Sequence, residues 1–176
     1  MTLEFRTEFN YPLIMAAPVT TEVHWLSDAE QRSWRAWLSA MLLLQERLER
    51  DLKSVHGLTM AEYEVMVRLS ESPDKRLRMS ELAGRTLASK SRLSHQISRM
   101  EEDGLVRREE CPEDRRGAYA VLTDRGWKAL VAAAPDHVTS VRAWFVDVMT
   151  PEEFETLGAL CARVAERVQS GCPAED

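Results

Sequence analysis

Polar and basic side chains recur between residues 89 and 99, opposite an apolar stripe of Leu93, Ile97 and Met100. We expect the stripe to pack on the domain core and the opposite face to stay accessible. Arginine and glutamine make paired hydrogen bonds with guanine and adenine edges, and serines at a helix start offer hydroxyls and free amides to phosphate. This chemistry suits recognition of duplex DNA; the alternative is a solvated helix face used for protein contact. The candidate residues are Ser89, Lys90, Ser91, Arg92, His95, Gln96 and Arg99.

A second concentration of charge, Asp114, Arg115 and Arg116, lies between the turn residues Pro112 and Gly117. The flanking residues alternate apolar and polar side chains, which predicts a hairpin with this charged segment at its tip. An arginine at a hairpin tip can enter the minor groove, where the negative potential of A·T tracts is strongest. Asp114 does not favour phosphate, so we expect it to hold Arg115 or Arg116 by a charge-assisted hydrogen bond. The alternative is a solvated turn.

The charge distribution supports a localised phosphate-binding face. The 176-residue chain has a formal net charge of −6, but the segment from Arg76 to Lys128 holds twelve Lys and Arg against nine Asp and Glu. Between Arg85 and Met100 there are four basic residues and no acidic one. A basic element within an acidic body is typical of a protein that contacts nucleic acid through one face.

Capping residues and periodicity predict the elements that position these charges. Ser27, Thr59 and Thr150 each precede a Glu three residues further on, which is the capping-box pattern of a helix start. Ser89 and Thr123 are N-caps of two further helices. We expect helices over residues 27–55, 59–69, 80–85, 89–103, 124–149 (interrupted or kinked at Pro135) and 150–168, with strands over 105–109 and 118–122.

Two short helices joined by a tight turn, the second basic and followed by a charged hairpin, predict a winged helix-turn-helix. The first and last predicted helices carry apolar stripes larger than a small winged domain can bury, which predicts a homodimer. The expected fold class is mainly α with a small β wing: a winged helix-turn-helix plus a helical dimerisation base. The predicted domains are an N-terminal arm (1–26), a dimerisation region (27–57 and 124–170), a DNA-binding domain (58–123) and a tail (171–176).

The segment from Leu82 to Leu130 resembles the core of the MarR (multiple antibiotic resistance regulator) family. Its most specific marks are the string Asp114-Arg115-Arg116-Gly117 and the opening of the next helix at residues 122–126. The resemblance implies an obligate homodimer in which Arg116 enters the minor groove with Asp114 as its orienting partner. It also implies a pseudo-palindromic operator and a repressor that a small ligand releases.

Some members of this family hold phenolic or aromatic acids between the dimer base and the winged domain. Aromatic and methionine side chains at helical spacing offer such a cleft here, and their alternative role is core packing. The candidates for a small aromatic or phenolic ligand are Trp25, Trp34, Trp37, Met41, Met60 and Tyr63.

Other classes of function lack support in the sequence. There is no nucleophile elbow, phosphate-binding glycine loop or HExxH motif, so we expect no enzyme, no catalytic residue and no cofactor. The three cysteines and four histidines have no zinc-ligand spacing, so we expect no metal. No apolar run is long enough to cross a membrane, and the short run ending at Val19 lacks the features of a signal peptide, which predicts a cytoplasmic protein. The remaining alternatives are a helix-turn-helix protein-interaction module and a non-specific nucleoid-type DNA-binding protein.

Overall fold

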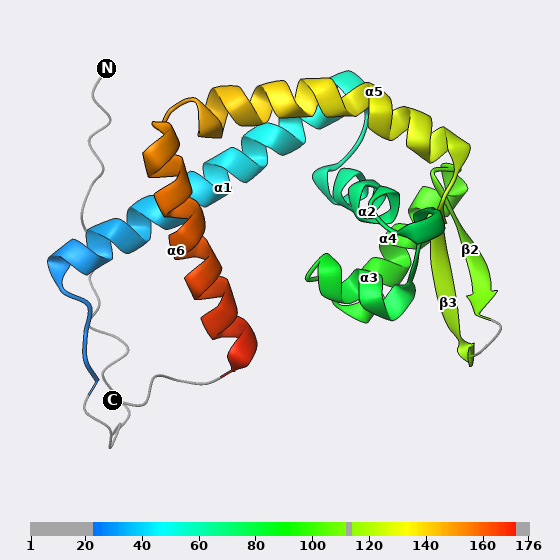
Figure 1. Cartoon of the computed structure of the whole chain (residues 1–176), viewed down its shortest axis with the longest axis horizontal. Helices are drawn as coiled ribbons and strands as arrows, with labels where there is room; N and C mark the ends of the chain where they lie inside the picture. Colours follow the sequence, from blue (N-terminus) through cyan, green and yellow to red (C-terminus); the bar gives the residue numbers. More distant parts are fainter. Residues whose placement is uncertain (1–22, 112–113, 172–176) are drawn as a thin grey trace, which may run out of the picture. The chain divides into compact units, whose positions relative to one another are not determined.

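The computed structural model describes residues 23–111 and 114–171, and only the backbone of Asp114, Arg115 and Arg116 (Figure 1). The chain divides into two compact units, Met1–Ser39 and Ala40–Asp176, and each is described by itself. Helix α1 (Asp28–His56) begins in the first unit and ends in the second. Within the described ranges, no helix is both long and apolar enough to span a membrane.

The helices begin close to the predicted positions, and all except the one that begins at Met79 have the expected side-chain caps. In the capping boxes, the hydroxyls of Ser27, Thr59 and Thr150 accept from an amide three residues on, and the Glu at that position accepts from the cap amide. Ser89 and Thr123 also cap their helices through the side-chain oxygen. The helices are α2 (Met60–Ser70), α3 (Met79–Arg85), α4 (Lys90–Glu102), α5 (Asp124–Val141) and α6 (Pro151–Ser170).

Three antiparallel strands form a small sheet in the order β1-β3-β2. They are β1 (Arg76–Arg78), β2 (Val106–Cys111) and β3 (Asp114–Leu122). Leu77 on β1 and Arg108 on β2 both pair with Ala120 of β3, so these residues share one face of the sheet. Ala120 is fully buried and Leu77 nearly so, which identifies this face as the one against the core.

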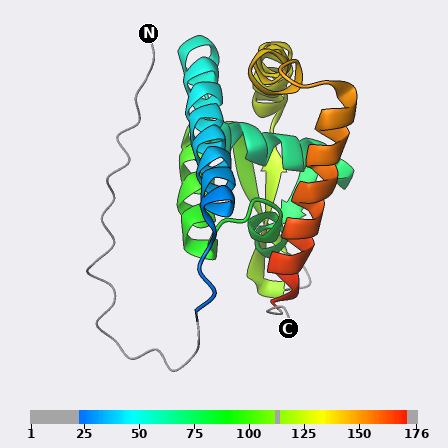
Figure 2. The same ribbon diagram turned by 90° about the vertical axis from the view of Figure 1, so that its left-hand side faces the viewer.

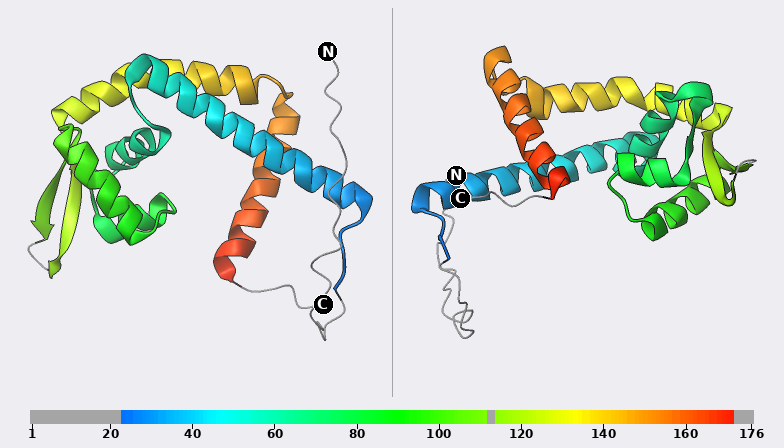
Figure 3. Two further views of the ribbon diagram at one scale, coloured as in Figure 1. Left: turned by 180° about the vertical axis from the view of Figure 1, so that it is seen from behind. Right: turned by 60° about the horizontal axis from the view of Figure 1, so that its bottom comes forward.

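The core lies among α2, α3, α4, α5 and the sheet, which gather at one end of α5 (Figure 3). Its fully buried side chains include Met66, Leu69, Leu82, Leu93 and Ile97. The first turn of α5 closes this core, and a Cβ added at Gly126 would lie only 2.1 Å from the carbonyl oxygen of Leu105. A residue without a side chain is therefore needed at position 126 for α5 to approach the start of β2 so closely.

The structure corrects three details of the sequence analysis. Of the two alternatives at Pro135, the interruption is excluded: α5 continues through Pro135 to Val141, and a π-helix, η2 (Arg142–Val146), follows it. The hairpin strands extend further than expected, and the backbone of Asp114 already pairs with Cys111. Strand β1 was not expected, because three residues are too few to show an alternating pattern.

Helix α6 leaves its apolar stripe uncovered in the chain by itself. The chain turns sharply after α5, and α6 then runs as one uninterrupted helix (Figures 1 and 2). None of its residues is buried, although Leu160, Val164 and Val168 recur at helical spacing and are 48%, 61% and 74% exposed. A stable amphipathic helix normally buries such a stripe against a second surface.

Candidate DNA-binding surface

Helix α4 is held with one face inside the core and the other in solvent. Leu93, Ile97 and Met100 are fully buried, as the apolar stripe predicts. The Ser89 side chain accepts from the Arg92 amide at 3.3 Å and caps the helix. The first turn therefore presents backbone amides and side chains together, which suits phosphate and base contacts. Of the predicted residues, the exposed ones are Ser89, Lys90, Ser91, Arg92, His95 and Arg99.

Gln96 does not lie on the exposed face where we expected it. It is only 8% exposed, and its amide nitrogen Nε2 has no hydrogen-bond partner. The sequence contains a signal for this burial, because position 96 follows Leu93 by three residues and precedes Met100 by four, so that it adjoins the apolar stripe. The exposed face of α4 therefore consists of the serines, the basic side chains and His95.

A tight turn joins α3 to α4 and sets the angle between them. The Thr86 hydroxyl donates to the carbonyl oxygen of Leu82 at 2.9 Å, and the Ala88 amide donates to that of Ala83 at 3.1 Å. Leu87, between them, has a φ of 52°. These contacts fix the helix-turn-helix that the sequence predicts.

Arg108 of β2 connects the wing to α4, a role that its sequence pattern did not indicate. Its guanidinium Nη2 donates to the carbonyl oxygen of Ser94 at 2.8 Å and to the Ser98 hydroxyl at 3.0 Å. Its Nη1 donates to Glu101 Oε2 at 3.3 Å. Because all three partners are on α4, this side chain fixes the hairpin to the helix. This role depends on the strand register, which places Arg108 on the same face of the sheet as the buried Ala120.

The predicted wing residues are described only in part. The backbone of Asp114, Arg115 and Arg116 belongs to β3, but their side chains lie outside the described residues. The outer face of the sheet, away from the core, carries Arg76 and Arg78, whose guanidinium groups lie 5.0 and 5.6 Å from the ring centre of Tyr119. Glu109 lies on the same face and pairs with both Arg76 and Arg107, so part of this positive charge is balanced.

The six predicted cleft residues line neither of two cavities found among the described residues. Trp25, Trp34 and Trp37 belong to the unit Met1–Ser39, where the rings of Trp34 and Trp37 stack at 5.1 Å. In the other unit, Met41 is exposed, whereas Met60 packs against the core and Tyr63 is part of it. Met60 and Tyr63 therefore have the core-packing role that was the alternative to ligand binding.

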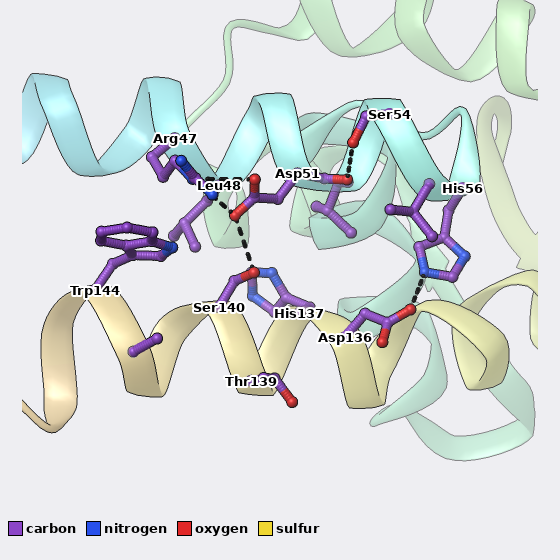
Figure 4. A pocket seen from close by; sticks show the side chains of 13 residues that line it. Arg47, Leu48, Asp51, Ser54, His56, Asp136, His137, Thr139, Ser140 and Trp144 are labelled. Atoms are coloured by element: carbon purple, nitrogen blue, oxygen red, sulfur yellow. Dashed lines mark hydrogen bonds and ion pairs between the residues drawn. The ribbon is translucent and has the colours of Figure 1, made fainter.

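A cavity of about 330 Å³ lies instead between the second half of α1 and α5 with η2 (Figure 4). The Arg47 guanidinium lies 4.3 Å from the Trp144 ring centre, and its Nε is 3.0 Å from Asp51 Oδ1. Ser140 donates to Asp51 Oδ2 at 3.0 Å. Burial alone would raise the pKa of Asp51, but the hydrogen bonds from Arg47 and Ser140 lower it overall, so the carboxylate stays charged at neutral pH.

Two histidines line the other end of this cavity. His56 Nε2 and Asp136 Oδ2 are 2.8 Å apart, which links α1 to α5. The His137 ring packs at 4.5 Å on Tyr63, and its Nδ1 is buried without a partner. Burial lowers the pKa of His137, so this ring is neutral at physiological pH. Among the described residues, no group of three or more His, Cys, Asp or Glu side chains is arranged to hold a metal ion.

The helix-turn-helix, its hairpin wing and the basic face of α4 define a winged-helix DNA-binding protein of the transcription-regulator class. The MarR family model matches residues 56–117. AbsC, a MarR family transcriptional regulator from Streptomyces coelicolor, is 49% identical with a TM-score of 0.81, covering 84% of this chain and 99% of AbsC. The chain belongs to the MarR family.

Two further relatives agree with this assignment. Sco3205, a MarR family transcriptional regulator from Streptomyces coelicolor solved in complex with DNA, is 44% identical with a TM-score of 0.82, covering 84% of this chain and 92% of Sco3205. The transcriptional regulator HosA from Escherichia coli O127:H6 is 33% identical over 113 residues, which are 64% of this chain and 82% of HosA. The family consists of DNA-binding transcription regulators rather than enzymes, as the sequence analysis predicts.

Proposed function

We propose that the chain represses transcription as a homodimer that binds a pseudo-palindromic operator, with α4 of each protomer in the major groove. The observation that carries this proposal is the division of α4 into two faces. Leu93, Ile97 and Met100 are fully buried, whereas Lys90 and Arg92 in its first turn are exposed. The N-terminal residues of a helix anchored in this way can enter the groove while its apolar stripe stays packed on the core.

The homodimer is supported by the uncovered apolar side chains of α1 and α6. Helix α6 buries none of its residues, and Trp37, Leu42 and Leu43 of α1 are 44%, 60% and 65% exposed. Exposed stripes of this size in a single chain are typical of an interface between subunits. We assign residues 27–57 and 124–170 to dimerisation and 58–123 to DNA binding. A two-fold axis would then place two copies of α4 about one helical turn apart.

Release by a small aromatic or phenolic ligand is the second part of the proposal, and the α1–α5 cavity supports it. Its volume of about 330 Å³ is in the range of small-molecule sites. Leu48, Leu52 and Trp144 supply apolar surface, while the paired side chains of Arg47 and Asp51 supply polar groups that can hydrogen-bond a phenolic hydroxyl. Because the cavity lies between α1 and α5, a bound ligand can change the angle at which α5 leaves the winged domain.

The test is selection of duplexes from a randomised library by the full-length protein, followed by mobility shift with the recovered sequence. We expect a pseudo-palindromic site with half-sites about ten base pairs apart. In transcription from a promoter overlapping that site, added protein should lower transcript yield, and a ligand should restore it. Recovery of no preferred sequence would support a nucleoid-type protein, and absence of any DNA binding at low salt would support a protein-interaction module.

A further inference from the structure

Leu87, in the turn between α3 and α4, has a backbone conformation that disfavours its own residue type. Its φ of 52° lies in the left-handed region, where the Cβ of an L-residue crowds the backbone. Glycine adopts this conformation without strain, and asparagine or aspartate tolerates it better than leucine. The fold therefore tolerates a leucine here at the expense of some stability.

The leucine side chain contributes no packing to the described chain in return. Leu87 is 88% exposed, more than any other large hydrophobic side chain among the described residues. The turn is closed by hydrogen bonds back to α3 from Thr86, Ala88 and the backbone amide of Leu87, and the Leu87 side chain takes no part in them. Neither the core nor the turn geometry accounts for a large apolar side chain at this position.

The position of Leu87 indicates what its side chain can contact. It precedes the N-cap Ser89 by two residues, so it lies at the end of α4 that carries the exposed Lys90 and Arg92. If the N-terminal end of α4 enters the major groove, the Leu87 side chain lies at the rim of that groove. The major groove displays one apolar group, the C5-methyl of thymine, which aliphatic side chains recognise by contact.

We propose that Leu87 is a specificity residue that contacts a thymine methyl group in each half-site. This inference rests on the proposed function, because it requires α4 to enter the major groove. Apolar contact with a deoxyribose would bring affinity without sequence preference, and contact with another protein would leave DNA binding unchanged. Measurements of DNA affinity therefore distinguish sugar contact and protein contact from recognition of the methyl group.

The probe is a duplex that the wild-type protein selects from a randomised library, resynthesised with uracil in place of each thymine in turn. Uracil lacks only the methyl group, and removal of one buried methyl changes affinity roughly four-fold. We expect one thymine in each half-site to show this loss with the wild-type protein. Leu87→Ala should bind the thymine and uracil duplexes equally, whereas Leu87→Met should retain the preference.

Leu87→Gly separates backbone strain from DNA contact. We expect this variant to melt a few degrees above the wild type, because glycine relieves the strain, and to lose the thymine preference like Leu87→Ala. Equal losses on thymine and uracil duplexes would overturn methyl recognition in favour of sugar contact. Unchanged DNA affinity of Leu87→Ala, with or without a changed oligomeric state, would also overturn it.

Arg92→Ala, measured on the same duplexes, distinguishes failure of this inference from failure of the proposed function. If Arg92→Ala weakens binding and Leu87→Ala does not, only the role of Leu87 is wrong. If neither substitution weakens binding, α4 is not the reading helix and the proposed function fails with it.

Discussion

The carboxylate of Glu101 on α4 accepts two hydrogen bonds from Arg108 on β2: one from the backbone amide at 2.8 Å and one from the guanidinium at 3.3 Å. The same guanidinium reaches Ser98 and Ser94, one and two turns earlier on the helix. Helix α4 and the first strand of the hairpin are therefore joined along more than one helical turn. Because charge-assisted hydrogen bonds are stronger than neutral ones, we expect the two elements to move as one body.

Arg108→Ala should lower both the free energy of unfolding and the affinity for DNA. The variant leaves the Glu101 carboxylate without its cationic partner, and we expect a loss of about 1–3 kcal/mol of stability by urea denaturation. The matched control is Arg107→Ala, since Arg107 is an exposed neighbour that pairs with Glu109 on the outer face. Equal stability of the two variants would show that the Arg108 network does not hold the wing.

Charges introduced into the α6 stripe should dissociate the proposed dimer. Leu160→Asp or Val164→Asp would place a carboxylate in the apolar interface, where its desolvation is unfavourable. Sedimentation of these variants should give a monomer at concentrations at which the wild type is a dimer. Ala162→Asp, about half a helical turn from Val164, introduces the same charge on the opposite face and should remain dimeric. A dimer in all three variants would exclude α6 from the interface.

His137 should make stability depend on pH in a defined window. Burial lowers its pKa in the folded chain below the ordinary value of 6.5, so the unfolded chain binds a proton first as the pH falls. The contribution of His137 to the free energy of unfolding should therefore be constant well above this value and should decrease as the pH falls below it. His137→Phe keeps an aromatic ring against Tyr63. In this variant the free energy of unfolding should fall less between pH 7.5 and 5.5 than in the wild type. Parallel stability profiles for the two proteins would contradict this assignment.

Arg116→Ala tests the predicted wing contact. Loss of an arginine from the minor groove should weaken operator binding by about 1–3 kcal/mol and should change the preference for A·T pairs beside the half-sites. Lys128→Ala removes one positive charge from the exposed surface of α5 and is the control for a change in net charge. Affinity equal to that of the control would show that Arg116 does not enter the groove.

The sequence predicted the helix-turn-helix because local chemistry determines it. Ser89 and Thr123 cap their helices from the positions expected, and the stripe of Leu93 and Ile97 is buried as its spacing predicts. Each of these features depends on residues within a few positions of one another, so periodicity and capping rules are sufficient.

Features that depend on contacts between distant elements were not predictable in the same way. The role of Arg108 arises from strand register, and β1 forms only because β3 offers it an edge. The α1–α5 cavity depends on how two helices some eighty residues apart in the chain pair, as in the His56–Asp136 contact. The burial of Gln96 was predictable from its place beside the stripe, but the hydrogen-bonding capacity of glutamine favoured the opposite assignment.

Sequence-specific recognition through α4 is the central claim, and the ratio of two dissociation constants tests it most directly. Fluorescence anisotropy at 0.15 M salt would compare the selected operator with a scrambled duplex of equal length and composition. We predict that the wild type prefers the operator by at least about 10³-fold, and that Arg92→Ala loses most of this ratio while retaining its binding to scrambled DNA. A ratio near one for the wild type, or an unchanged ratio for Arg92→Ala, would contradict the account.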